Sequence, residues 1–425
     1  MATLLISLGI FLILGIPIGY SLGLSGFLYF VVYHPELLPI LPQRLYSGMD
    51  SYAMVALPLF VLMGLLMNEG GITRRLIDFS LVFVGRLRGG LGAVNVLASM
   101  IFGGISGSSV SDTASIGAVL IPEMKKKGYT PQFASGITVA SSTMGMIIPP
   151  SVPMVIYAFV AEASVGKLFL AGVFPGIMIG FLMLGITLVI SAWRKYPKEE
   201  VALTRREVVI RIERAILALI MPIFVVGAVV TGIATATESA GIGALYAFLV
   251  GYFIFRGLKL KVIPTLLATS VLTSAQVMII IALSKLYIWI LVIEHIPQTV
   301  AGFISGFDLP VFLILLVISA IILITGTFVD VSPAILLLTP VFLPAVTSLG
   351  VSPIQFGVIL ITGLAIGLVT PPVGMCLNVG SAISKLGIGT IFRAAVPFSL
   401  ANVITLILIA LIPPISMWLP SVLMD

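Results

Sequence analysis

The sequence has little charge and almost no cysteine or histidine. Charged residues make up 9% of the 425 residues, whereas a soluble domain carries about 25%. The single cysteine, Cys376, excludes a disulfide framework and any cysteine-based metal site. The only histidines, His34 and His295, lie far apart in the sequence. Zinc-dependent hydrolysis and Ser-His-Asp catalysis therefore lack their usual residues, and we expect no enzyme.

Hydrophobic residues, at 60% of the chain, dominate what remains. No soluble fold could bury so much apolar surface, so we expect the chain to fold in a lipid bilayer. The net charge of +6 does not indicate nucleic-acid binding, because the basic residues lie between apolar runs. We read the first run as the first transmembrane helix, because it lacks the basic start and cleavage site of a signal peptide. Runs long enough to span a membrane lie at 3–33, 50–68, 165–192, 215–233, 237–255, 262–292 and 390–417.

The basic residues predict an orientation. If segment 193–214 is cytoplasmic, threading the chain outward places all but three of the 22 basic residues on the same side. The exceptions are Arg44, Lys167 and Lys285. This asymmetry follows the positive-inside rule, and it places the C-terminus in the periplasm.

Two regions, 90–162 and 308–384, are apolar but broken by Gly, Ser, Thr, Asp and Pro. We interpret each as a helical hairpin that enters the membrane and turns back, followed by a helix interrupted midway. Such irregular backbone persists at membrane depth only where protein buries it or where it lines a cavity. The threading opens the first hairpin to the cytoplasm and the second to the periplasm.

The two regions also repeat each other. MGMIIPPSVPM at the first break aligns with IGLVTPPVGMC at the second, and further Gly and Pro residues coincide at the same offset. Inverted repeats with paired broken helices are typical of secondary transporters. The sequence thus predicts an all-α polytopic membrane protein with two inverted-topology repeats, each containing a re-entrant helical hairpin and a broken transmembrane helix. The alternative is that Gly and Pro merely kink ordinary helices.

The breaks predict two sodium sites. Proline removes helical hydrogen bonds, so the carbonyls of 145–148 and 367–370 lose helical partners and can accept a desolvated cation. The hairpin tips add hydroxyl oxygens, although each hydroxyl could instead bond its own helix carbonyl. The first proposed site comprises Ser106, Ser108, Gly145, Ile148 and Pro150. The second comprises Thr325, Thr327, Gly367, Thr370 and Val373.

The same region predicts a site for an anionic substrate. The second arms of the hairpins begin at the midplane, with Ser111 or Asp112 as one cap and Asp330 or Ser332 as the other. Helix N-termini attract anions, so we expect a carboxylate substrate. An acidic side chain in the membrane is a functional candidate, although capping alone would also explain these two. Lys285, the one basic residue inside an apolar run, is not expected to bind substrate. The expected substrate-binding residues are Ser109, Asp112, Ser151, Asp330 and Asn378.

The motifs resemble a known family. GGISGSSVSDTASIG before the first Pro-Pro break and TGTFVDVSPAILLLTPVFLP before LVTPPVG are similar to the large membrane subunit of tripartite ATP-independent periplasmic (TRAP) transporters, within the ion transporter superfamily. The resemblance implies sodium-driven uptake of a carboxylate, such as sialic acid or a C4-dicarboxylate, with a slight leaning toward the sialic-acid type. It also implies an elevator motion, a periplasmic substrate-binding protein and a small membrane subunit, here expected on a separate polypeptide.

An elevator motion needs a moving unit and a scaffold. The hairpin regions hold nearly all polar groups at membrane depth and would move, while the long apolar helices would stay fixed. Segment 193–214 would form an interfacial arm helix or, alternatively, a solvated loop. The expected division is 1–89 scaffold helices, 90–162 first transport unit, 163–307 connecting and scaffold helices with the cytoplasmic arm 193–214, 308–384 second transport unit, and 385–425 C-terminal scaffold helix.

Three other functions remain open on the sequence. A standalone carrier or antiporter of the same superfamily would need no binding protein. A membrane-embedded enzyme would need Asp112 and Asp330 to lie nearly in contact. A passive channel fits poorly with two dead-end hairpins, which favour alternating access.

Overall fold

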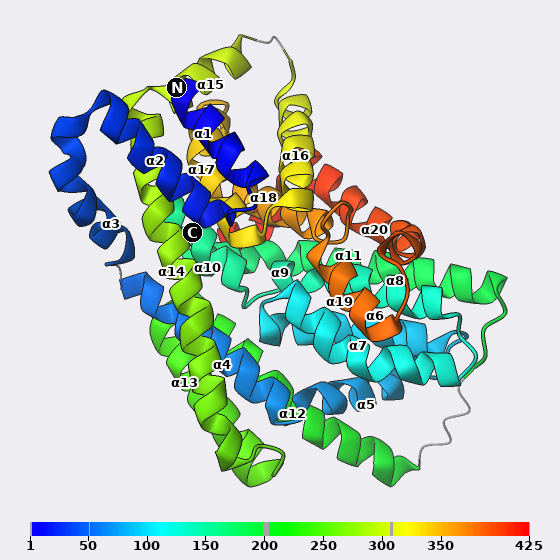
Figure 1. Cartoon of the computed structure of the whole chain (residues 1–425). Coiled ribbons are helices and arrows are strands. Elements are labelled where there is room, and N and C mark those ends of the chain that lie inside the picture. The colour runs from blue at the N-terminus through cyan, green and yellow to red at the C-terminus, as the bar shows by residue number, and fades with distance from the viewer. Residues whose placement is uncertain (1, 51, 199–203, 307–308, 425) are drawn as a thin grey trace.

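The computed structural model describes residues 2–50, 52–198, 204–306 and 309–424, and these ranges form helices with no β-sheet (Figure 1). The predicted all-α class is confirmed. In chain order the helices are α1 (Ala2–Ile13), α2 (Ile18–Tyr33), α3 (Leu41–Met49), α4 (Ala56–Glu69), α5 (Ile72–Val84), α6 (Gly90–Ser106), α7 (Ser109–Lys126), α8 (Pro131–Ser141), α9 (Met144–Ile147), α10 (Val152–Val160), α11 (Val165–Trp193), α12 (Arg205–Val230), α13 (Ala236–Leu249), α14 (Ile263–Ile293), α15 (Ile296–Ser305), α16 (Val311–Phe328), α17 (Val331–Ser348), α18 (Pro353–Gly367), α19 (Met375–Ser384), α20 (Ile388–Leu411) and α21 (Pro414–Met424).

Seven helices of the described ranges are long and apolar enough to cross a membrane. They include α11, α12, α14 and α20, whose apolar runs the sequence predicted. Two further spans are bent pairs: α4 with α5, at 67°, and α8–α9 with α10, at 42°. The chain is therefore polytopic, as predicted from its composition.

The N-terminal run is not the single transmembrane helix that its hydrophobicity predicts. It divides into α1 and α2, of 12 and 16 residues, which are each short for a membrane span. Gly15 adopts a left-handed φ of 79°, and Pro17 immediately precedes α2. Because proline cannot continue the preceding helix and glycine allows the reversal, the chain turns back at this point.

The expected arm and the C-terminal helix also differ from the prediction. In the described part of segment 193–214, which omits 199–203, the expected arm is the start of α12, which begins at Arg205 and continues to Val230. Thr204 and Glu207 form a capping box that starts α12 within the charged segment. Near the C-terminus, Pro413 separates α20 from α21, so the expected single helix is two.

Two helical hairpins, each followed by a broken helix, form the centre of the molecule. In the first, α6 packs against α7, and α8, α9 and α10 follow. In the second, α16 and α17 precede α18, and an irregular segment joins α18 to α19. The Pro149–Pro150 and Pro371–Pro372 peptide bonds, one in each break, are cis.

The two units interlock rather than sit apart. Helix α19 of the second unit packs against α7 and α8 of the first, and α20 also packs along α8 (Figure 1). Both breaks are therefore held in one body.

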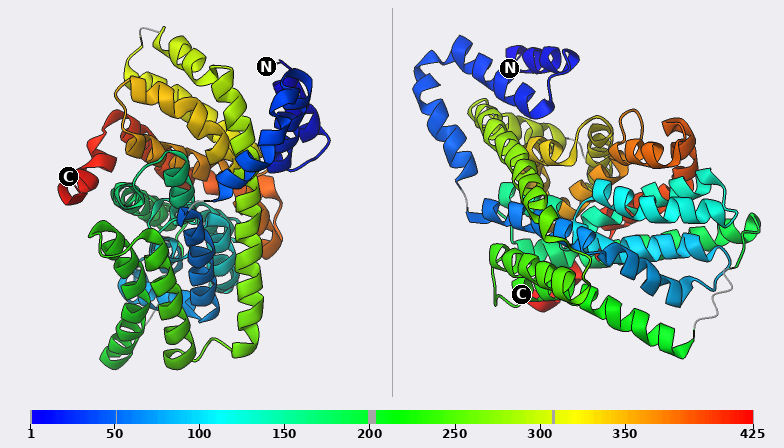
Figure 2. Two further views of the ribbon diagram at one scale, coloured as in Figure 1. Left: turned by 90° about the vertical axis from the view of Figure 1, so that its left-hand side faces the viewer. Right: turned by 60° about the horizontal axis from the view of Figure 1, so that its bottom comes forward.

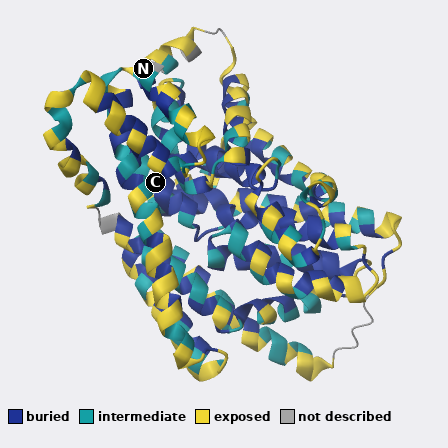
Figure 3. Cartoon of the chain, viewed as in Figure 1, coloured by how far each residue is buried: buried dark blue, intermediate teal, exposed yellow. Residues whose placement is uncertain are grey.

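This body contains the most buried part of the chain (Figure 3). Helix α18 is buried from Ile354 to Gly367, and α8 is buried from Phe133 to Ser141. Enclosure of this kind lets broken backbone persist at membrane depth.

Helix α14 runs along the edge of this body as a long rod (Figure 2). It packs on α2, α3 and α4 on one side and on α17 on the other. The second hairpin and the N-terminal helices therefore meet through α14.

Candidate functional site

The tip of the first hairpin is a short turn between α6 and α7. Gly107, at φ 61°, ends α6, and a side chain at this position would lie 3.0 Å from the backbone nitrogen of Val152. Ser108 caps α7, because its Oγ accepts a hydrogen bond from the Ser111 backbone N–H at 3.5 Å. The predicted caps, Ser111 and Asp112, are therefore wrong. The left-handed glycine lets α7 start at Ser109, which places both residues inside its first turn.

Asp112 faces the first break. Its Oδ1 accepts a hydrogen bond from the Ser106 hydroxyl, and its Oδ2 has no hydrogen-bond partner among the described residues. Asp112 is fully buried, and a Cβ added to Gly145 would collide with this Oδ2. Buried charges are normally paired or bound to a metal ion. An oxygen-rich site with one bare carboxylate oxygen fits a hard cation.

The structure brings together most of the first predicted sodium site. Ser106 and Ser108 hydrogen-bond each other across the tip, Gly145 lies against Asp112, and the carbonyl oxygen of Pro150 is 3.3 Å from where a Gly107 Cβ would lie. The side chain of Ile148 points away, toward Gly176 of α11. Asp112, expected to bind substrate, belongs by position to this cluster.

The second tip contacts the second break in a similar way. The backbone N–H of Val373 donates to the carbonyl of Thr327 at 3.2 Å. A Cβ added to Gly367 would collide with the backbone of Gly326. Asp330 caps α17 as predicted, accepting from the backbone N–H of Val331 at 2.8 Å.

The hydroxyl groups of this second cluster bond their own helices. Thr325, Thr327 and Thr370 donate to helix carbonyls at 2.9, 2.7 and 2.8 Å, which is the alternative that the sequence left open. Each oxygen keeps a lone pair that can still coordinate a cation. Unlike the first cluster, this one has no carboxylate among the residues proposed for it.

Several carbonyls at the breaks find other partners. The Ser151 hydroxyl donates to the carbonyl of Met146 at 2.6 Å, and the Cys376 backbone N–H donates to Leu368 at 3.1 Å. Asn378 donates to the carbonyl of Val373 at 2.9 Å. Ser151 and Asn378, expected to bind substrate, therefore brace the two breaks in this structure.

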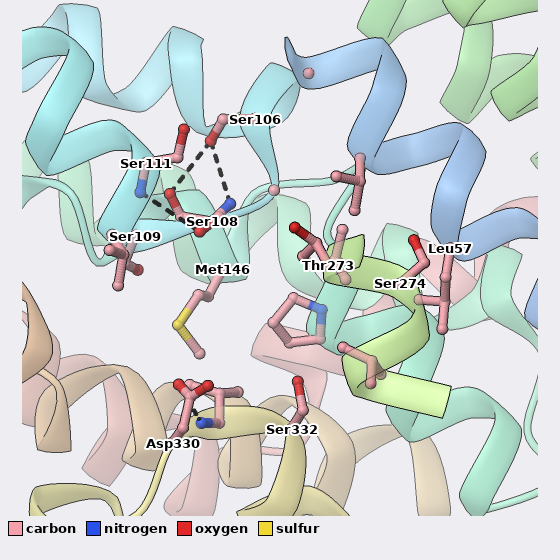
Figure 4. A pocket seen from close by; sticks show the side chains of 18 of the residues that line it. Leu57, Ser106, Ser108, Ser109, Ser111, Met146, Thr273, Ser274, Asp330 and Ser332 are labelled. Carbon is pink, nitrogen blue, oxygen red and sulfur yellow. Dashed lines mark hydrogen bonds between the residues drawn. The ribbon is translucent and has the colours of Figure 1, made fainter. Parts of the chain in front are cut away.

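A cavity of about 400 Å³ lies between the two hairpin tips. Figure 4 shows the serines of the first tip on one side and Asp330 and Ser332 on the opposite side, with Thr273 and Ser274 of α14 on a third. Of the expected substrate-binding residues, Ser109 and Asp330 line the cavity, whereas Asp112, Ser151 and Asn378 do not.

Sequence reasoning missed the contribution of α14. Its polar cavity residues are Thr269, Thr273, Ser274 and Gln276. Three of these, Thr269, Thr273 and Gln276, repeat at the i, i+4, i+7 spacing of one helix face. This stripe of polar residues in the sequence indicates that one face of the helix meets protein, water or a ligand.

Four helices begin at this cavity. The first residue of each helix lines the cavity: Ser109 of α7, Val152 of α10, Val331 of α17 and Met375 of α19. Helix N-termini present unpaired N–H groups and the positive end of the helix dipole. The cavity can therefore hold an anion beside the two candidate cation clusters.

Comparison with known proteins gives a consistent result. A family model described as "Tripartite ATP-independent periplasmic transporter, DctM component" matches residues 5–415. The C4-dicarboxylate TRAP transporter large permease protein DctM of Pseudomonas aeruginosa is 37% identical over 401 residues, covering 94% of each chain. The sialic acid TRAP transporter large permease protein SiaM of Vibrio cholerae is 35% identical, covering 96% of this chain and 95% of its own.

Another relative and one solved structure extend the comparison. The 2,3-diketo-L-gulonate TRAP transporter large permease protein YiaN of Escherichia coli is 35% identical, covering 94% of each chain. The crystal structure of the YdaH transporter of Alcanivorax borkumensis matches with a TM-score of 0.62 at 16% identity, covering 89% of each chain. At that identity the structural likeness concerns the fold alone.

Proposed function

The chain belongs to the DctM family of tripartite ATP-independent periplasmic transporters, and from this premise we propose that it couples inward movement of a carboxylate-bearing solute to sodium. Membership makes it a multi-pass protein of the inner membrane and a transport component. The proposal adds the coupling ion, the direction of transport and the mechanism.

One observation supports this function above the others. The unpaired carboxylate oxygen of Asp112 lies against the Gly145 backbone, directly behind the tip that lines the cavity. A sodium ion there would neutralise a buried charge and place positive charge near the N-terminus of α7. Cation and carboxylate would then favour each other's binding, as symport requires.

The second cluster supports a second sodium ion. There Thr327 and Val373 join the tip to the break, and Gly326 lies against Gly367. The atoms available to coordinate an ion there are carbonyl and hydroxyl oxygens, which suit a hard cation. Substrate would then lie between two ions of opposite repeats.

The interlocked hairpin body would move as a unit against α14 and the helices packed on it. The cavity lies at this boundary, because the hairpin tips and the two breaks form part of its wall and α4 and α14 form the rest. Movement of the body would carry both ion clusters and the solute together. We propose this elevator motion, with a periplasmic binding protein delivering the solute and a small membrane subunit completing the scaffold.

Uptake into proteoliposomes tests the proposal. The complex of the large and small subunits, with the cognate binding protein outside, is supplied with a panel of carboxylates including N-acetylneuraminate and succinate. We expect uptake in an inward sodium gradient and at least a tenfold loss when choline replaces sodium. Equal uptake in choline would contradict sodium coupling. Equal uptake by the large subunit alone would contradict the tripartite mechanism and favour a standalone carrier.

A further inference from the structure

The face that α14 presents to the cavity is polar although the helix lies in the membrane. Thr269, Thr273 and Gln276 line the cavity, whereas Val271 and Leu272 on another face are 60% and 64% exposed. A polar face on a membrane helix is costly unless it meets protein, water or a polar ligand. The cavity is what these side chains meet.

Three of the polar side chains that α14 presents to the cavity lack protein partners, whereas the Thr269 hydroxyl donates to the Thr265 carbonyl of its own helix at 2.9 Å. Thr273 and Gln276 make no side-chain hydrogen bond to another described residue, and the Ser274 hydroxyl, at 3% exposure, is also unpaired within the described chain. Hydroxyl and amide groups that face a cavity without a protein partner are free to hydrogen-bond a solute. An amide donates two hydrogen bonds and accepts others, so Gln276 alone can engage more than one group of a solute.

The opposite wall favours one negative charge. Ser109, the first residue of α7, is 1% exposed, and its hydroxyl has no partner among the described residues. It lies in the cavity wall where α7, α10 and α19 begin, and the positive ends of helix dipoles favour an anion there. A single carboxylate would be held by these donors.

The rest of the cavity disfavours a second carboxylate. Asp330 is the only ionisable side chain among the described residues that line it, so no Lys, Arg or His in that set would neutralise another anion. Two carboxylates sharing a site repel each other. A hydroxyl or amide of the solute would instead donate to Asp330, whose Oδ1 is engaged only by its own helix.

We propose that the cavity selects a solute with one carboxylate and several hydroxyl or amide groups, and that Thr273 and Gln276 of α14 bind those groups. The carboxylate lies at the N-termini of α7, α10 and α19, and the hydroxylated part lies between Asp330 and α14. This inference deepens the proposed function and rests on it. It distinguishes a hydroxylated monocarboxylate, such as a sugar acid, from a plain dicarboxylate.

Direct binding to the purified membrane complex tests the selectivity without the binding protein. The probes are D-gluconate and N-acetylneuraminate, as hydroxylated monocarboxylates, and succinate, as a plain dicarboxylate, each titrated calorimetrically in sodium and in choline buffer. We expect one of the hydroxylated probes to bind at least tenfold more tightly than succinate in sodium. Succinate binding as tightly as both, or more tightly, would overturn the inference and leave the proposed function standing. Absence of sodium-dependent binding by every probe would count against both.

Variants of α14 assign the effect to named side chains. Gln276→Met and Thr273→Val each remove polar groups at nearly constant size, and we expect each to weaken the hydroxylated probe roughly three- to tenfold. Succinate affinity should not change. Thr265→Val is the matched control, because Thr265 lies on the same helix but does not line the cavity. Equal loss for both classes of probe, or an effect of Thr265→Val equal to that of Thr273→Val, would contradict the assignment.

Discussion

Asp112 and Asp330, the acidic residues near the two hairpin tips, occupy different surroundings. Asp112 is buried behind the first tip with one oxygen unpaired, whereas Asp330 is open to the cavity and caps α17. In the proposed function, Asp112 would therefore bind the ion and Asp330 would meet the solute. The two acids require different tests.

Replacing Asp112 by Asn tests its role in ion binding. Asp112→Asn keeps the size and the contact with Ser106 but removes the charge, so we expect a higher sodium concentration for half-maximal uptake. Uptake at low sodium should fall at least about tenfold, which corresponds to roughly 1.4 kcal/mol. Asp78→Asn, on the partly exposed α5, is the control. An unchanged sodium dependence in Asp112→Asn would exclude the carboxylate from the ion site.

Gly145 offers a steric test of the same cluster. Gly145→Ala would place a methyl group on the Asp112 carboxylate and push the tip from the break. We expect uptake to be lost and stability to fall by about 1–3 kcal/mol, the usual cost of overpacking. Gly185→Ala on α11 is the control, because a Cβ there meets nothing within 4 Å. Normal uptake in Gly145→Ala would show that the tip and the break need not touch.

Secondary-structure elements show where the sequence was informative. Composition and run length predicted the helical class and long spans such as α11 and α14, because lipid imposes a minimum apolar length. The Pro-Pro pairs predicted where the broken helices are interrupted, because proline acts locally. The cap at Ser108 and the division of α1 from α2 were missed, because each depends on a left-handed glycine that composition does not show. The wall formed by α14 was missed because it depends on tertiary packing between distant segments.

The cap that Ser108 provides for α7 can be tested by substitution. Ser108→Ala removes the Oγ acceptor at the start of α7, and we expect the helix to lose about 1 kcal/mol. Because that helix start lines the cavity and the cation cluster, uptake should fall by more than the loss of stability explains. Ser164→Ala removes the equivalent cap of α11, away from the cavity. Thermal melting and uptake are measured for both, and equal effects on uptake would contradict a special role for the first tip.

In the proposed elevator, the interlocked hairpin body moves against α14 and the helices α2, α3 and α4 that pack on it. The cavity lies between them, so its walls must part or shift for a solute to leave. Elevator transport requires these walls to move relative to each other, while contacts inside the body persist. Restraints placed across the boundary and within the body should therefore act differently.

Paired cysteines test this division. Gln276→Cys with Ser332→Cys places thiols on opposite walls of the cavity. A short bis-methanethiosulfonate crosslinker, which forms a disulfide with each thiol, should stop uptake until a reductant cleaves those disulfides. Ser99→Cys with Ser141→Cys, whose native Oγ atoms are 2.8 Å apart inside the body, should form a bridge that leaves at least half of the uptake. Full uptake with the cavity pair crosslinked would contradict relative motion of the two walls.

The contacts of Gly103 with Gly145 and of Gly326 with Gly367 bring main chain against main chain, with no room for a methyl group. A substitution elsewhere cannot remove these main-chain contacts, whereas the cavity wall formed by α14 consists of side chains that substitution can exchange. Changes on α14 could therefore alter which solute is bound while the contact between tip and break persists. Relatives named for C4-dicarboxylates, sialic acid and 2,3-diketo-L-gulonate are consistent with such a separation.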